Sequence, residues 1–507
     1  MTRQIVTDAQ PRMDGGLNSI SDDSVLAENQ VRTSLNGRLT DFGAITKRGG
    51  SRRVSAALGG SPVRNGYTWR LLGGTPQILA ISGGTLYTTN WGTFPWTWTA
   101  QTGTLDANAT PTLAKFRDGG SDVVYIADGG QLNKWNGTTL TTNIAGTVGA
   151  KRITVHNQRL WSCGCGVAPD SIFYSSLNNG DTLGNASAGG GEIIVRTFGD
   201  QNVVALDSVG TSLIIYHRKG VSRLTGFGQD DIFVAPAGIT ADTGLIAPYS
   251  PVVADGIGYF VSERGLYAVT ESAAAPVSTP ASPDPLLPII RALSTSDFDN
   301  IRTEVNRATR ELWITIPGFG CFVYHTILRS WSGPWDTGWV DPQTVSMWES
   351  IDDNGLPVVL RADSDGFVLL CDAPGINVDN AAADGTGGSA FRFSVQFRRM
   401  YFGDQALAKA FRFGYLTAQL RGSTTARVTW QSQEAYGTYD LAASPGSVWG
   451  SAGATWGTGT WGGSGSQSYR VPMGGSGYFA DVTFDEDGTG LPILSSMQLQ
   501  AFALGRR

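Results

Sequence analysis

The stretch ILAISGGTLYTTNW, residues 78–91, decides the fold that this sequence predicts. It consists of an apolar strand, a pair of glycines, and a second strand with alternating apolar side chains. Tight hairpin turns require positive φ angles, which glycine adopts readily, so the pattern predicts a β-hairpin. Related hairpin patterns recur at VVYIADGGQLNKWNG (123–137), RLWSCGCGVAPDSIFYSS (159–176), SLIIYHRKGVSRLTG (212–226), IGYFVSERGLYAVT (257–270), ELWITIPGFGCFVYHT (311–326), PVVLRADSDGFVLLCD (357–372) and, more weakly, GAITKRGGSRRVSA (43–56).

The spacing of these hairpins indicates how they are arranged. Their turn glycines follow one another by 46, 90, 45, 55 and 46 residues, and the step of 90 contains the hairpin that begins at Arg159. These glycines are Gly84, Gly130, Gly220, Gly265, Gly320 and Gly366. A period of about 45–55 residues is typical of four-stranded propeller blades. The sequence therefore predicts an all-β protein with a β-propeller of six or seven blades over residues 43–375. An array of β-sandwiches is the alternative, but its strands usually lack such a longer period.

The segments on either side of the repeats predict two further regions. Residues 1–42 are expected to form an N-terminal arm with a strand and a short helix, the helix at 21–35. A second short helix is expected at 286–295. After about residue 375 the repeats stop, a Gly/Ala/Asp-rich linker follows, and long strands with alternating apolar residues begin. Residues 376–507 are therefore predicted to form a smaller β-sandwich-like domain with a Trp/Gly-rich loop.

Composition limits the class of protein. Hydrophobic residues make up 41% of the chain and charged residues 16%, which is typical of a folded protein. A net charge of −6 argues against a general nucleic-acid binder. Only six of the 37 basic residues are lysines, and arginine suits buried or interfacial pairing with carboxylates. No signal peptide and no membrane segment is expected, because no long apolar run occurs.

The residues that usually carry catalysis or bind metals do not form a recognisable site. His156, His217 and His325 are far apart, and no nucleophile elbow, zinc helix or phosphate loop is present. Cys163, Cys165, Cys321 and Cys371 are predicted to be buried thiols, because free cysteine is among the most buried residue types. The acidic pairs Asp230-Asp231, Asp352-Asp353, Asp363/Asp365 and Asp485/Asp487 mostly precede glycine, which indicates turns rather than a carboxylate pair or a calcium loop. The chain is therefore predicted not to be an enzyme, with no catalytic, cofactor-binding or metal residues.

Two groups of residues are candidates for contacts with partners. Lys47, Arg48, Arg52 and Arg53 flank a Gly-Gly pair, where they would form a solvent-exposed hairpin tip or contact an acidic partner or a phosphate. The second group lies in the Trp/Gly-rich loop, where tryptophans could stack on sugars, anchor a neighbouring chain, or pack within their own loop. These tryptophans are Trp449, Trp456 and Trp461.

Several segments together resemble a known family. TDFGAITKRGGSRRV, from Thr40, is similar to the opening segment, Gly-hydrophobic-Thr-Lys-Arg-x-Gly, of the tail hub or nozzle proteins of short-tailed bacteriophages, also called packaged-DNA stabilisation proteins. The resemblance extends through about residues 40–340, and it is one of order and pattern. It is carried further by KRITVHNQRLWSCGC, SIFYSSLNNGD, SLIIYHRKGVSRLTG, GIGYFVSERGLYAVT and EVNRATRELWITIPGFGCFVYHTILRSWSG.

The resemblance implies a structural virion protein that is made in the host cytoplasm and assembled into the phage tail. Such proteins form a ring, commonly a homohexamer, below the portal and the tail adaptor. The ring would extend the DNA channel, retain the packaged DNA, and bind tail fibres or tailspikes. Genomic double-stranded DNA would pass through it non-specifically, and an acidic protein suits such a conduit because it does not hold DNA by counterion release.

Two other functions remain open from the sequence. One is a carbohydrate-binding or glycan-hydrolysing phage tail protein that uses the Trp/Gly-rich loop and the acidic pairs. The other is a minor tail or capsid scaffold that forms no channel.

Overall fold

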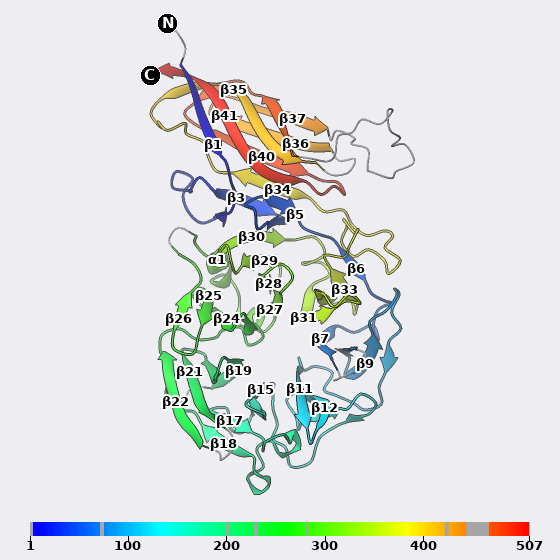
Figure 1. Cartoon of the computed structure of the whole chain (residues 1–507). Coiled ribbons are helices and arrows are strands. Elements are labelled where there is room, and N and C mark those ends of the chain that lie inside the picture. The colour runs from blue at the N-terminus through cyan, green and yellow to red at the C-terminus, as the bar shows by residue number, and fades with distance from the viewer. Residues whose placement is uncertain are drawn as a thin grey trace.

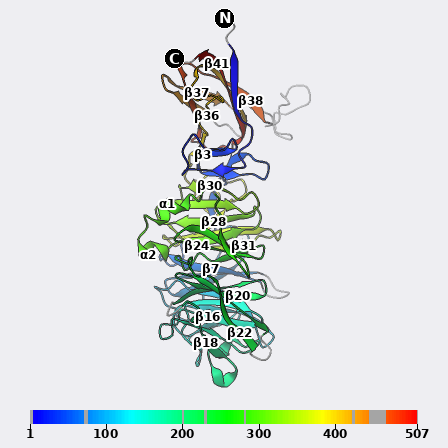
Figure 2. The same ribbon diagram turned by 90° about the vertical axis from the view of Figure 1, so that its left-hand side faces the viewer.

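The computed structural model describes residues 4–70, 76–198, 202–227, 232–279, 282–420, 425–442 and 466–505. A ring of β-sheets forms one end of the molecule and a second β domain the other, and both chain ends lie at the second domain (Figure 1). Turned by 90°, the molecule is elongated, with the second domain stacked on the rim of the ring (Figure 2).

Six four-stranded sheets form separate blades of a β-propeller. The first blade contains β7 (Val63–Trp69), β8 (Gln77–Ser82), β9 (Thr85–Asn90) and β10 (Thr99–Ala100). The second contains β11 (Thr112–Asp118), β12 (Ser121–Ala127), β13 (Asn133–Trp135) and β14 (Leu140–Thr141). The third contains β15 (Arg152–His156), β16 (Arg159–Cys163), β17 (Ser171–Tyr174) and β18 (Gly191–Ile194). The other three contain β19 (Val203–Val209), β20 (Ser212–His217), β21 (Val221–Phe227) and β22 (Ile232–Thr240); β23 (Val252–Ala254), β24 (Ile257–Ser262), β25 (Gly265–Val269) and β26 (Ala274–Pro276); and β31 (Thr344–Ile351), β32 (Pro357–Asp363), β33 (Val368–Cys371) and β6 (Ser51–Arg53). The predicted all-β propeller is thereby confirmed.

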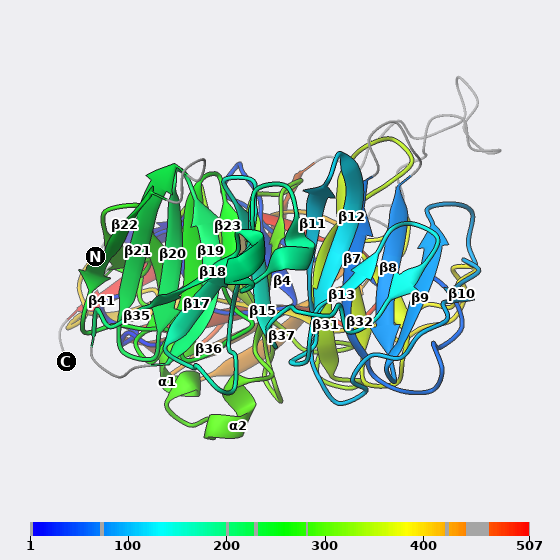
Figure 3. The same cartoon turned by 90° about the horizontal axis from the view of Figure 1, so that it is seen from below.

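A further unit of four strands stands in the ring between β23–β26 and β31–β33 and is called here the shared blade. It contains β27 (Arg302–Asn306), β28 (Glu311–Ile316), β29 (Gly320–His325) and β30 (Ser330–Trp335). The first strands of successive units, β7, β11, β15, β19, β23, β27 and β31, are neighbours around the ring, and β31 returns to β7. Seen from below, neighbouring blades stand side by side (Figure 3).

Apolar side chains between neighbouring blades hold the ring together. One such cluster joins Trp69 and Leu79 of the β7–β10 blade to Val124 and Trp135 of the next blade. The other clusters repeat this arrangement around the propeller, and the last joins the β31–β33 blade to the β7–β10 blade. Burial of these faces is the main stabilising contribution available to the propeller.

The ring is closed by strands from both sides of the repeat region. β6 pairs antiparallel with β33, with Arg52 opposite Leu370, so an early segment supplies the outer strand of the last blade. The expected hairpin at 43–56 is therefore wrong. Its first strand, β5 (Ile45–Lys47), instead pairs with β4 (Gly37–Leu39) and with β41 (Ile493–Gly505) of the second domain.

The second domain is built from both ends of the chain. One of its sheets contains β1 (Ile5–Gln10), β4, β5, β35 (Ala408–Gln419), β38 (Gln467–Pro472), β39 (Ser476–Gly477) and β41. The other contains β2 (Gly16–Leu17), β3 (Gln30–Leu35), β34 (Phe393–Phe397), β40 (Ala480–Glu486), β36 (Thr425–Ser432) and β37 (Tyr436–Ala442), and β3 also joins β30 of the shared blade. The core between the sheets combines Met13, Val31 and Ile45 with Phe484 and Leu499. The prediction that a smaller β domain follows the propeller is thus confirmed.

Helices are few and short in the described part of the chain. The expected helix at 21–35 is wrong, because residues 30–35 form β3, which pairs with β34 and β2. The expected helix at 286–295 corresponds to α1 (Leu286–Ile290), and α2 (Thr295–Phe298) follows; both lie at one face of the propeller (Figure 3). Short 3-10 turns occur at η1 (Gly180–Thr182) and η2 (Ala186–Ala188).

The turn glycines of the repeated hairpins adopt positive φ angles at Gly84, Gly265, Gly320 and Gly366, as expected. At the 128–130 turn it is Gly129 that does so, with φ of 104°. Gly220 has a different role, because a Cβ atom there would lie 2.7 Å from the Phe198 ring.

Candidate functional site

The basic segment from Lys47 to Arg53 lies at the junction between the propeller and the second domain. β5 ends at Lys47 in the second domain, and β6 begins at Ser51 in the propeller, so the segment crosses from one to the other. Arg48 is 1% exposed and Lys47 is 2% exposed. The interpretation of this segment as a solvent-exposed hairpin tip is therefore wrong for these two residues, and their side chains are internal contacts rather than a surface for a partner.

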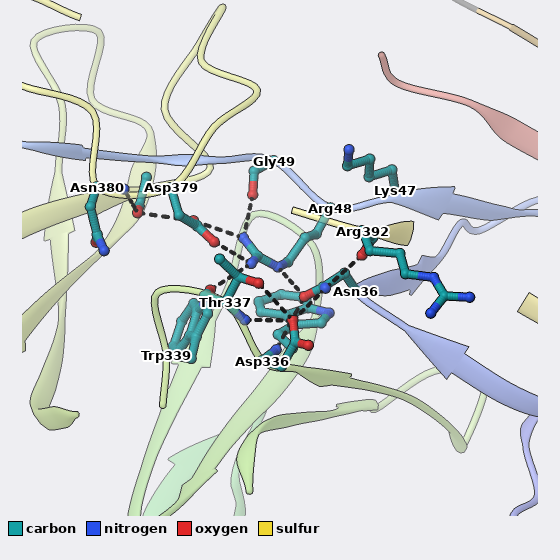
Figure 4. Close-up of polar contacts among 12 residues, drawn as sticks. Asn36, Lys47, Arg48, Gly49, Asp336, Thr337, Trp339, Asp379, Asn380 and Arg392 are labelled. Carbon is teal, nitrogen blue, oxygen red and sulfur yellow. Dashed lines mark hydrogen bonds and ion pairs between the residues drawn. The ribbon is translucent and has the colours of Figure 1, made fainter. Parts of the chain in front are cut away.

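Arg48 is the centre of a buried polar network (Figure 4). Its Nη1 atom donates to Asp379 Oδ1 at 2.9 Å, and its Nη2 atom forms the second contact with the same carboxylate. Nη2 also donates to the Thr337 carbonyl oxygen at 2.9 Å, and Nε donates to Asn36 Oδ1 at 3.0 Å. The guanidinium carbon lies 3.9 Å from the centre of the Phe391 ring. One side chain thus links β3's end, the shared blade and the segment that enters the second domain.

Asn36 extends this network between the domains (Figure 4). Its Nδ2 atom donates to Asp336 Oδ1 at 2.6 Å and to the Arg392 carbonyl oxygen at 2.7 Å. Its own φ angle is 52°, a left-handed conformation that asparagine tolerates better than most residues. The junction is therefore fixed by hydrogen bonds as well as by the shared sheet.

Lys47 forms a second buried ion pair on the side of the second domain. Its Nζ atom lies 2.7 Å from Glu486 Oε2 and donates to the Gly488 carbonyl oxygen at 2.5 Å. Both charged side chains of the pair are fully buried. Burial lowers the pKa of Lys47, while the Glu486 carboxylate partly offsets this by favouring the charged form.

Arg52 and Arg53 lie on the propeller side and are half-buried. Arg52 donates from Nε to the Ala383 carbonyl oxygen at 2.9 Å and packs over the Phe94 ring at 4.1 Å. Arg53 packs over the Phe367 ring at 3.9 Å. The other predicted contact residues, Trp449, Trp456 and Trp461, lie outside the described residues.

Sequence reasoning missed the acidic partners and one further arginine at the junction. Asp379 and Glu486 follow their basic partners by 331 and 439 residues, so no local pattern could pair them. Arg38 donates from Nε and Nη2 to the two carboxylate oxygens of Glu311, at 2.7 and 2.6 Å. Its Nη1 atom donates to Asp372 Oδ2 at 2.7 Å. The scarcity of lysine relative to arginine was the only signal of such forked pairing.

A cavity of about 280 Å³ lies at the centre of the propeller and is lined by β7, β11, β15, β19, β23, β27 and β31. Tyr249 projects into this region, with Arg152 3.2 Å and Arg302 4.4 Å from the centre of its ring. Its hydroxyl group donates to the Thr110 carbonyl oxygen at 3.0 Å. Burial lowers the pKa of Arg302 to about 10. The central cavity is thus lined by stacked cationic and aromatic side chains.

Two carboxyl groups also line this central cavity. Burial raises the pKa of Asp207 to about 7, although Tyr216 and Arg152 act in the opposite direction. Burial likewise raises the pKa of Glu304 to about 7. Both groups therefore change charge near neutral pH in the folded chain.

The other residues singled out in the sequence have structural roles. All four cysteines are free and buried, as predicted. Asp352 and Asp363 accept backbone N–H groups within their own turns, which confirms the turn interpretation at these two positions. Asp485, on β40, accepts a hydrogen bond from Arg392. Asp230 and Asp231 lie outside the described residues. Each histidine forms a hydrogen bond: His156 with Ser208, His217 with Ser222, and His325 with Asp41.

Within the described ranges, no group of three or more His, Cys, Asp or Glu side chains could hold a metal ion. No helix in the same part of the chain has the length and apolar character needed to span a membrane. Neither a protein-family model nor a curated protein matches this chain.

Proposed function

We propose that this chain is a structural protein of a short-tailed phage tail, the nozzle or hub that forms a ring below the portal and the adaptor. The ring, commonly of six copies, extends the DNA channel, retains the packaged DNA and binds tail fibres or tailspikes. The chain is made in the host cytoplasm and works in the virion. Its function is to carry load and provide surfaces for neighbours, and it performs no catalysis.

The observation that carries the proposal is the construction of the junction. The segment that resembles the phage family, from Gly43 to Gly50, supplies β5, the Lys47 and Arg48 ion pairs, and a close backbone approach. A Cβ atom at Gly50 would lie 2.2 Å from the Val378 carbonyl oxygen, so this position requires glycine. Arg48 therefore joins the two β domains, while β5 and Lys47 anchor the same segment in the second domain. Rigid joining suits a subunit that must transmit force without bending.

The size of the central cavity determines where DNA would pass. At about 280 Å³, the cavity accommodates a small molecule and not a duplex. The DNA channel must therefore lie between the copies of a ring, and not along the axis of one propeller.

The test is the oligomeric state of the purified full-length chain. We expect light scattering to detect a species of about six times the 53.7 kDa chain mass, and negative-stain micrographs to show rings with a central opening. Labelling of the chain in intact virions should place it at the tail. A protein that is monomeric at all concentrations and absent from the tail in labelled virions would overturn the proposal.

One observation favours carbohydrate binding as a second candidate function. A surface pocket of about 520 Å³ on the β7–β10 blade is lined by Trp96 together with Asn90, Gln77 and Gln101. Trp96 is buried, so the carboxamide and hydroxyl groups of the pocket are what would bind the hydroxyl groups of a sugar. A glycan array should then give hits that Asn90→Ala weakens, whereas an array without hits would exclude this candidate.

A further inference from the structure

A larger cavity, called here the mouth cavity, opens beside the central cavity at one end of the propeller axis. It has a volume of about 770 Å³, within the range typical of small-molecule sites. Its walls come from several blades, including β7, β15 and β19, and from the segments that precede β11 and β27. Arg152 and Tyr249 line both cavities and so form part of the wall between them.

The mouth cavity is positively charged, although the chain as a whole is acidic. Its charged lining consists of four basic side chains and two carboxyl groups: Arg64, Lys151, Arg152, Arg218, Asp128 and Asp299. Asp128 is already bound internally, because it accepts the N–H groups of Asp106 and Gly130. Arg218 is exposed, and its Nη1 atom donates a hydrogen bond to the Ile246 carbonyl oxygen. The charge that faces a ligand in this cavity is therefore mainly cationic.

Arg152 is the buried member of this group. It is 8% exposed, and within the described ranges its guanidinium makes only a long hydrogen bond, from Nη1 to Thr112 Oγ1 at 3.4 Å. Its Nη2 atom has no hydrogen-bond partner among the described residues. The carboxyl groups of Asp299 and Asp207 favour its charged form electrostatically, but neither forms an ion pair with it in those ranges. Stacking on the Tyr249 ring and one long hydrogen bond leave this buried guanidinium without an anionic partner, which is costly, since such groups are normally paired with an anion.

We propose that the mouth cavity binds a small organic or inorganic oxyanion, carrying a carboxylate or a phosphate, with Arg152 as the buried anchor. Arg64 and Arg218 at the rim complete the site, because guanidinium groups bind both kinds of oxyanion through paired N–H donors. Asn108, Asn202 and Asn300 line the same cavity and could contact the rest of the ligand, although Asn300 also donates to the Ser296 carbonyl oxygen at 3.3 Å. This site is independent of ring formation, since a single chain contains all of it.

The test measures anion binding by isothermal titration calorimetry at constant ionic strength, with chloride as the reference anion. Inorganic phosphate and glucuronate are the two probes, and they distinguish the phosphate from the carboxylate form of the ligand. We expect one of them to bind with a dissociation constant of about 1 mM or lower. Arg64→Gln should weaken this binding about tenfold, because it removes one charge-assisted contact.

Two further variants make the result decisive. Arg152→Gln should abolish binding, and Arg117→Gln, which changes an exposed arginine on β11 outside the cavity, should leave it unchanged. If Arg152→Gln does not fold, the rim variants Arg64→Gln and Arg218→Gln still test the site. Absence of binding by both probes at about 10 mM, or equal affinities of the rim variants and Arg117→Gln, would overturn the proposal.

Discussion

The Arg48–Asp379 pair illustrates why a buried ion pair is demanding at the scale of single residues. Taking both charges out of water is expensive, and the pair is tolerated because the guanidinium has further acceptors in Thr337 and Asn36. The carboxylate in turn accepts a hydroxyl hydrogen bond from Ser51 at 3.0 Å. Removing one partner would leave the other charged and buried.

We therefore predict that Asp379→Asn lowers the free energy of unfolding by about 3–5 kcal/mol. Urea denaturation followed by tryptophan fluorescence measures this value. The matched control is Asp440→Asn, which breaks the exposed pair between Arg427 and Asp440 and should change stability little. Equal midpoints for the two variants would show that the buried network does not hold the junction.

A second residue-scale prediction concerns pH. The pKa values of Asp207 and Glu304 are raised to about 7 in the folded chain but return to about 4 on unfolding. The folded state therefore holds more protons between these values, so its stability falls as the pH rises from about 4 to about 7. Arg152 near Asp207 and Arg307 near Glu304 limit the effect without reversing it.

The double variant Asp207→Asn/Glu304→Gln tests this pH dependence. We expect its free energy of unfolding to vary less between pH 5 and 8 than that of the unchanged chain, by an amount on the order of a few kcal/mol. Urea denaturation at several pH values gives the slope. A slope identical to that of the unchanged chain would mean that these two groups ionise normally in the fold.

At the scale of elements, β6 closes the propeller with only three residues. Ser51 and Arg53 donate their backbone N–H groups to Val378 and Ala381, away from β33. Because N–H groups alternate in direction along a strand, the N–H group of Arg52 faces Leu370 on β33. Together with Val54, which follows β6 and donates its N–H group to the Val368 carbonyl oxygen at 2.9 Å, Arg52 thus supplies the backbone donors that close the ring.

Arg52→Pro should therefore destabilise the chain by on the order of 3 kcal/mol more than Arg52→Ala does. The alanine variant is the control, because it loses the contacts with Phe94 and Ala383 but keeps the backbone donor. Thermal unfolding ranks the variants, and hydrogen exchange should show faster exchange in β33 for the proline variant. If both variants melt at the same temperature, closure by β6 contributes little to stability.

Hairpins could be predicted from the sequence because their two strands are neighbours in the chain and the glycine turn is local. The pairing of β6 with β33 and of β1 with β41 could not, since hundreds of residues separate the partners. The same reason explains the wrong helix at 21–35. Val31 and Ser34 carry a pattern compatible with a helix, and only their distant partners in β34 make them a strand. The burial of Lys47 and Arg48 could likewise not be predicted, because their acidic partners are also hundreds of residues away in the sequence.

At the scale of the whole molecule, the propeller is inserted between two parts of the second domain. Residues 4–47 and 391–505 contain the strands of that domain, and the described propeller lies between them in the chain. The insertion points are close, because Asn36 accepts the Arg48 backbone N–H group and donates to the Arg392 carbonyl oxygen. The continuous sheet through β30 and β3 then fixes the orientation of one domain on the other.

This arrangement predicts how the chain can be divided. A fragment of residues 376–507 should not fold alone, because β1, β3, β4 and β5 and the core residues Met13, Val31 and Ile45 are missing from it. Joining residues 1–48 to 391–507 through a short Gly/Ser linker should restore a folded domain, since both sheets then regain these strands. Circular dichroism and the dispersion of amide NMR signals distinguish the two products.

A matched control joins residues 391–507 to the same 48 residues in scrambled order, which should stay unfolded. If the 376–507 fragment alone shows native dispersion, the N-terminal strands are accessory to this domain, and the insertion of the propeller does not determine its folding.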